Sequence, residues 1–196
     1  MKIFYRVVTA LIAVCIVPNM LYNTLIRLVY SAGKNFVESK LSLMKIIDLF
    51  GEGGLLHGVF DNLSGSGNGE ALKSILPYAI ASGVLLALAL LVGLGIVVIN
   101  IIKPMQKTTL ILCGCGILLT LSAMIVFNKG FAAPILTGAV SISDLIGGGV
   151  MGMLVSLFSG VKALQMGTAA IMNIIIFIVI AVWTGAYVLT DLGNNE

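Results

Sequence analysis

Charged side chains are scarce in this chain: they make up 10% of its 196 residues, whereas 59% of the residues are hydrophobic. A soluble globular domain carries about 25% charged residues, so the composition excludes that class of protein. Intrinsic disorder requires low hydrophobicity and high net charge, and it is excluded for the same reason. The mean hydropathy of +1.14 predicts an integral membrane protein.

Residues that build disulfides and metal sites are also few. Cys15, Cys113 and Cys115 are the only cysteines, and all lie in apolar runs, so no loop holds a disulfide framework. A single histidine, His57, excludes a cluster of histidine ligands. The sequence also lacks the glycine loop of nucleotide-binding proteins and the helix motif of zinc proteases. We therefore expect no enzyme activity, no cofactor, no metal site and no nucleic-acid partner.

Stretches without charge locate the membrane spans. A helix of about 20 apolar residues crosses a hydrocarbon core of about 30 Å. The sequence predicts an all-α, polytopic membrane protein that forms one domain and has four transmembrane helices. These spans are expected at about 7–26, 75–102, 108–128 and 169–190. Pro18 predicts a kink in the first span, because neighbouring helices can satisfy the carbonyl that a proline leaves unpaired.

Positive charge near the ends of short segments sets the orientation of a membrane protein. The first six residues hold Lys2 and Arg6, and the 103–107 turn holds two more cations, with no acid in either segment. The long loop 27–73 balances its cations with acids. We therefore expect a cytoplasmic N-terminus and turn, with loop 27–73 outside. A cleaved signal peptide would remove the first span, but no small-residue cleavage site follows the apolar run, so an uncleaved anchor is expected.

The outer loop 27–73 contains an amphipathic stretch at 34–50. Val37, Leu41 and Met44 recur at three- and four-residue steps, and charged residues fill the positions between them. This spacing predicts an amphipathic helix over 34–50 that lies on the bilayer surface or packs against a neighbouring subunit.

The segment 131–161 is too apolar for an exposed loop, since Asp144 is its only charge. It is expected to be embedded, either as a Gly-rich fifth span or as a re-entrant hairpin that turns near 141–144. The fifth span would place the C-terminus outside. The re-entrant segment would return the C-terminus to the cytoplasmic side with the N-terminus.

A ridge of small residues is predicted within this embedded segment, because small side chains recur every four residues and fall on one face of a helix. Such a glycine zipper lets another backbone approach closely. The alternative is a flexible break at 147–149. The ridge consists of Gly148, Gly152, Ser156 and Gly160.

Four polar residues are candidates for a pore lining or for polar contacts between helices. Asn19, Asn23 and Arg27 recur every four residues and predict a polar stripe on the outer half of the first span. Asp144 is a functional candidate because carboxylates at membrane depth are rare, although it could instead cap the helix that follows it.

Three classes of function fit these features. The chain could be a subunit of an oligomeric membrane assembly such as a channel or pore, an accessory subunit of a larger transport, secretion or enzyme complex, or a small transporter. Little buried charge and no visible inverted repeat weaken the transporter hypothesis. We expect a non-enzymatic subunit that forms a homo-oligomer, or joins other membrane subunits, within the lipid bilayer.

Overall fold

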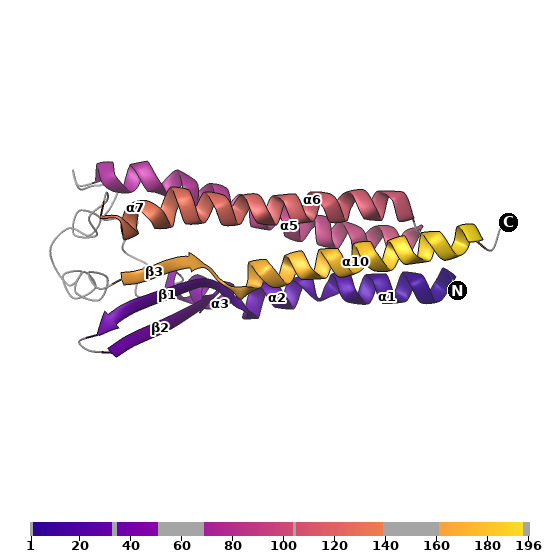
Figure 1. Ribbon diagram of the computed structural model, residues 1–196, viewed down its shortest axis with the longest axis horizontal. Helices are drawn as coiled ribbons and strands as arrows, with labels where there is room; N and C mark the ends of the chain where they lie inside the picture. The colour runs from indigo at the N-terminus through magenta and orange to yellow at the C-terminus, as the bar shows by residue number, and fades with distance from the viewer. Residues whose placement is uncertain (1, 33–34, 51–68, 104, 139–160, 194–196) are drawn as a thin grey trace.

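The molecule is a bundle of long helices with a small sheet at one end (Figure 1). Both chain termini lie at the opposite end of the bundle. The prediction of four spanning helices is confirmed in that four helical segments are long and apolar enough to cross a membrane. The computed structural model describes residues 2–32, 35–50, 69–103, 105–138 and 161–193.

The first span is broken near its middle. Helix α1 (Lys2–Val14) is followed by α2 (Ile16–Tyr22), and the Cys15 amide bonds to the Ile12 carbonyl at 3.2 Å between them. Pro18 has no N–H to donate to the carbonyl four residues earlier, which explains an interruption at this point. The span covers Ile3–Tyr22 and therefore ends earlier than the predicted residue 26.

The second and fourth spans lie close to the predicted 75–102 and 169–190, whereas the third is longer than the predicted 108–128. The second span, Ser74–Ile102, belongs to α5 (Gly69–Ile102), and the fourth, Thr168–Thr190, belongs to α10 (Thr168–Gly193). At about 1.5 Å of rise per residue, these helices are longer than a hydrocarbon core of about 30 Å is thick. The third span runs continuously over Gln106–Leu136 and consists of α6 (Gln106–Ile125), the π-helix η1 (Val126–Ala132) and α7 (Ala133–Leu136).

The fold is mostly helical, as predicted, but it is not all-α, because three strands form an antiparallel sheet at the end of the bundle. They are β1 (Thr24–Ala32), β2 (Asn35–Ser42) and β3 (Val161–Met166), in the order β2-β1-β3. The Arg27 position of the predicted helical stripe therefore lies in a strand, since α2 ends at Tyr22.

The predicted amphipathic helix over 34–50 is wrong in its first half. Residues 35–42 form β2, and only α3 (Leu43–Phe50) is helical. Glu38 and Lys40 lie two residues apart, and this spacing places both side chains on the same face of a β-strand. The helix begins where Ser42 Oγ accepts the Lys45 amide at 3.4 Å, as an N-cap residue does.

The embedded segment predicted over 131–161 is also corrected at both of its ends. Residues 131–136 continue the third span as η1 and α7, and Val161 begins β3. Helix α7 and strand β3 lie at the same end of the bundle (Figure 1). The choice between a fifth span and a re-entrant hairpin concerns residues 139–160, which lie outside the described residues, so both stay predictions. The ridge residues and Asp144 lie outside the described residues.

Close helix packing depends on two glycines. A Cβ atom at Gly93 of α5 would lie 2.7 Å from Ile16 Cδ1 of α2. A Cβ atom at Gly116 of α6 would overlap the ring of Phe177 of α10. Larger side chains at these positions would push the helices apart, because a packed interior has no room for extra atoms. Glycine therefore sets the spacing of α2, α5, α6 and α10.

Candidate functional site

The sheet has one polar and one apolar face. Residues opposite each other in adjacent strands share a face, and Arg27 of β1 lies opposite Lys40 of β2 and Gln165 of β3. All three are exposed. On the other face, Leu28 lies opposite Leu164, and both residues are partly buried. The sheet therefore turns its charged face to solvent and its apolar face to the bundle.

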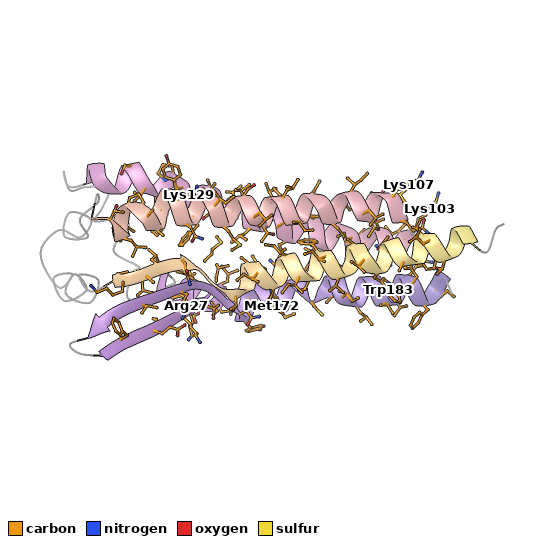
Figure 2. All side chains as sticks on the ribbon, viewed as in Figure 1. Arg27, Lys103, Lys107, Lys129, Met172 and Trp183 are labelled. Atoms are coloured by element: carbon orange, nitrogen blue, oxygen red, sulfur yellow. The ribbon has the colours of Figure 1, made fainter. Side chains whose placement is uncertain are left out.

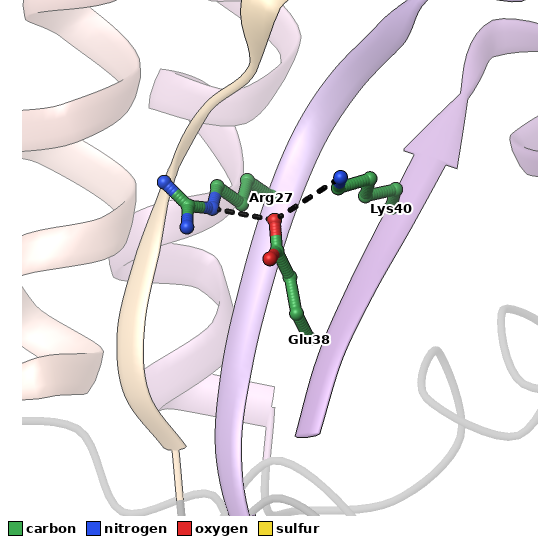
Figure 3. A network of polar contacts seen from close by, with 3 residues as sticks. All are labelled: Arg27, Glu38 and Lys40. Carbon is green, nitrogen blue, oxygen red and sulfur yellow. Dashed lines mark hydrogen bonds and ion pairs between the residues drawn. The ribbon is translucent and has the colours of Figure 1, made fainter. Parts of the chain in front are cut away.

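A network of three charges occupies the polar face (Figure 3). Glu38 Oε1 lies 2.7 Å from Arg27 Nε and 3.7 Å from Lys40 Nζ. The side chains of Arg27, Glu38 and Lys40 are 45%, 35% and 63% exposed, so water screens their attraction. Exposed ion pairs contribute at most about 1 kcal/mol to stability. The network therefore presents a charged surface more than it stabilises the fold.

Hydrogen bonds and buried side chains connect the sheet to the helices. Gly167, the residue between β3 and α10, donates its amide to the Leu25 carbonyl at the start of β1 at 2.8 Å. Met166 donates its amide to Asn128 Oδ1 of η1 at 3.1 Å. Leu25 and Met166 are both buried in the apolar core, so the sheet shares the core of the bundle.

The two edges of the sheet differ. Strand β3 lies between β1 and the η1–α7 segment, and Asn128 occupies one of its outward amides. Strand β2 has β1 on one side, and no strand of the described residues pairs with its other side. Residues 35–42 contain no proline, so every residue of β2 carries an amide donor. An edge of this kind is a template for pairing with another strand.

A chain of amides lies where the first and last spans meet. Asn19 donates to the Ala169 carbonyl at 2.8 Å and to Asn173 Oδ1 at 2.7 Å, and Asn23 donates to Asn19 Oδ1 at 2.6 Å. Asn173 Nδ2 lies 2.8 Å from Met20 Sδ. Asn19 and Asn173 are buried, so these groups join α2 to α10 within one chain.

Polar groups also join the helices at the end that holds the termini. Tyr5 donates its hydroxyl to Thr184 Oγ1 at 3.1 Å, which connects α1 to α10. Asn100 donates to Thr109 Oγ1 at 3.2 Å and connects α5 to α6. Asn100 Oδ1 is buried and has no partner among the described residues.

The guanidinium of Arg6 caps the C-terminal end of α5. Its Nε donates to the Asn100 carbonyl at 2.9 Å, and its Nη2 donates to the carbonyls of Ile101 and Ile102. These are the carbonyls that a helix C-terminus leaves without an intrahelical partner. A cation at this position is favourable because the C-terminal end of a helix carries partial negative charge.

An aromatic pocket lies on α1 and α10 near the same end. Phe4 packs edge-on against Trp183 with ring centroids 6.1 Å apart, and Tyr5 stacks on Tyr187 at 4.3 Å. The pocket has a volume of about 270 Å³, and Thr190 contributes to its wall. Trp183 Nε1 is buried without a partner in the described part of the chain. Aromatic residues of this kind are typical of the membrane–water interface.

The sequence predicted only part of these contacts. It singled out Asn19, Asn23 and Arg27 but missed Asn173 and Asn100, although each is an isolated amide within an apolar span. That isolation was a usable signal, because a buried amide requires a partner. Gly148, Gly152, Ser156, Gly160 and Asp144 lie outside the described residues, so their roles stay predictions.

The described residues hold no group of three or more metal-ligating side chains. The buried polar side chains of the described spans are amides and hydroxyls that bond to each other or to backbone carbonyls, and Arg6 and Lys129 are charged residues within span segments. None of the family models, curated proteins or solved structures compared with the chain matches it. The function proposed for the chain therefore rests on the geometry of its own residues.

Proposed function

We propose that this chain is a non-enzymatic, multi-pass membrane subunit that assembles into an oligomer, with its sheet as the part that meets partners. The observation that carries this proposal is the sheet beyond the ends of α2 and α10 and beside η1 and α7, with one charged face exposed and one edge without a described strand (Figure 1). An anchor alone would not require such a structured extension.

The outer surface of the bundle supports membrane insertion. Large apolar side chains are exposed along all four spans, including Leu11, Leu91, Ile111, Leu118 and Val182. In water this surface would cause aggregation, whereas hydrocarbon accommodates it. The buried amides and hydroxyls of the described spans bond to one another or to backbone carbonyls, as the bilayer requires of such groups.

The same internal bonding argues against a pore through a single copy. Asn19, Asn173, Thr109 and Thr184 are all buried and engaged in contacts between helices. A pore, if this assembly forms one, would lie between several copies. Positively charged residues lie at the start of α1 and directly after the end of α5. They support a cytoplasmic location for the termini, with the sheet on the other side.

The molecular mass of the purified protein in mild detergent tests the proposal. We expect a defined oligomer in light scattering after the detergent contribution is subtracted, and the same stoichiometry in lipid nanodiscs. A monomer in both environments would contradict self-assembly. An accessory subunit would instead be isolated in a stable complex with other membrane proteins.

A further inference from the structure

The outer edge of β2 is the place where a second strand can add to the sheet. The edge at β3 faces η1 and α7 of the same chain, and Asn128 already satisfies one of its amides. If β2 of one copy paired with β3 of the next copy, the outer edges of both strands would have to be free. Of the described strands only β2 has a free outer edge, so an edge-to-edge contact between two copies would use this edge twice.

The sequence of β2 is complementary to itself about Ser39. Glu38 and Lys40 flank Ser39, with opposite charges at equal distances from it. When two copies run antiparallel with Ser39 opposite Ser39, Glu38 of each copy lies opposite Lys40 of the other. Opposite charges in directly facing positions stabilise paired strands. An interface that uses one surface twice is the usual geometry of a two-fold symmetric dimer.

We infer that β2 pairs with β2 of a second copy of this chain, antiparallel and centred on Ser39. This inference rests on the proposed function, because it names the partner and the contact of the proposed assembly. Charged side chains at an edge often prevent pairing. Here the charges select the register instead. A two-fold centre at residue 38 would place Glu38 opposite Glu38, and a centre at residue 40 would place Lys40 opposite Lys40.

The exposed aromatic residue of β2 fits the same register. Phe36 is 72% exposed and lies three residues before Ser39, opposite Ser31 of β1. In the paired strands it lies opposite Ser42 of the second copy, a small residue that leaves space for the ring. Its exposed surface is then covered across the new interface.

The orientation of the strands determines the orientation of the two copies. Strands β1 and β2 extend beyond the ends of α2 and α10, with their length broadly along the axis of the bundle (Figure 1). The two-fold axis that relates antiparallel strands in one sheet is perpendicular to that sheet, so it reverses every direction within the sheet. The two helical bundles therefore extend in opposite directions, and the contact joins two membranes that face each other.

Disulfide trapping tests the register. In a chain without its three native cysteines, Ser39→Cys should form an intermolecular disulfide rapidly in mild detergent, because facing residues in paired strands bring their Cα atoms to about 5 Å. Phe36→Cys is the matched control. In the proposed register its two copies are six residues apart, about 20 Å, which is beyond disulfide reach. Equal cross-linking at both positions would overturn the register.

Charge exchange separates pairing from folding. In the Ser39→Cys background, Glu38→Lys alone and Lys40→Glu alone should each lower the disulfide yield to the Phe36→Cys level. Mixing the two variants should restore the yield as a heterodimer, because one copy then carries two lysines and the other two glutamates. Rescue on mixing also shows that each variant is folded. Unchanged yields in the single variants, or no rescue by the mixture, would contradict the inference.

Vesicles test the orientation. Two populations of vesicles with different fluorescent lipids, both carrying the Ser39→Cys chain, should adhere to each other and form disulfides between populations. Disulfides confined to one population would overturn the opposed arrangement. A defined oligomer in detergent without the Ser39 disulfide would refute this contact and leave the proposed function standing, whereas a monomer would refute both.

Discussion

Asn19 and Asn173 are 154 positions apart in the sequence, yet Asn19 Nδ2 lies 2.7 Å from Asn173 Oδ1. Asn19 gives its second hydrogen to the Ala169 carbonyl at 2.8 Å. Both side chains are buried where the first and last spans meet. A single amide therefore fixes the position of α10 against α2, at the level where the sheet begins.

Replacement of Asn19 should destabilise the fold measurably. Asn19→Ala removes the donor to Asn173 and to the Ala169 carbonyl and leaves both acceptors buried. Hydrogen bonds between membrane helices contribute about 0.6–2 kcal/mol, so we expect a free energy of unfolding lower by about 1–3 kcal/mol once the unpaired acceptors are included. Thermal or denaturant unfolding in detergent measures the change. Asn23→Ala is the control at an exposed position and should cost less, and equal losses would argue against the Asn19 contacts.

Two neighbouring glycines of α6 should respond in opposite ways. Gly116→Ala places a methyl group against the Phe177 ring and should destabilise the protein by about 1–3 kcal/mol, as overpacking does. Gly114 has open space around it, so Gly114→Ala should be neutral or stabilise by up to about 1 kcal/mol. Both are measured as shifts in melting temperature. In a Phe177→Leu background the cost of Gly116→Ala should shrink, and an unchanged cost would show that the ring is not the obstacle.

Arg6 should stabilise the bundle through the end of α5. Arg6→Met keeps a long apolar stem but removes the donors to the carbonyls of Asn100, Ile101 and Ile102. A cation at a helix C-terminus contributes about 0.3–2 kcal/mol, and we expect a loss in this range on unfolding. Lys107→Met, which removes an exposed cation on the next helix, is the control. Similar losses in both variants would indicate a general charge effect.

The two ends of the bundle should be accessible from opposite sides of the membrane. Lys103 and Lys107 lie at the end with the termini, whereas Arg27 and Lys129 lie towards the sheet (Figure 2). Single cysteines at Ser39 and Gln106, in a chain without native cysteines, should react with an impermeant reagent from opposite sides of intact cells. Ser39 should be labelled from outside. Labelling of both positions from outside would overturn the proposed orientation.

The small-residue ridge predicted for 145–161 also stays open to test. Gly152→Leu adds bulk at the predicted contact while favouring a helix, so we expect loss of the oligomer or of folding. Met153→Leu, on another face, should be tolerated. The mass in mild detergent and the melting temperature report the two effects. If Gly152→Leu assembles like the parent, the ridge is not a contact surface.

The sequence by itself determined the four apolar spans, because hydrophobicity over about 20 residues is a local property that crossing a bilayer requires. It also located the break near Pro18, since a missing amide acts within one turn. The ends of the spans were less certain. The third span was predicted to end at residue 128, before Lys129, yet the helical segment continues to Leu136 because a single lysine does not interrupt a helix.

Only the tertiary structure decided the sheet and the polar contacts. Strand β1 pairs with β2 nearby and with β3 more than a hundred residues later, and no local pattern specifies the second pairing. The stretch around Glu38 and Lys40 was predicted as a helix from its apolar spacing, and only its pairing with β1 identifies it as a strand. The partner of Asn19 could not be predicted either, because an amide can bond to any polar group that the fold brings within about 3 Å. The pairing of β1 with β3 depends on how the helices pack, and it completes the sheet that the proposed assembly uses.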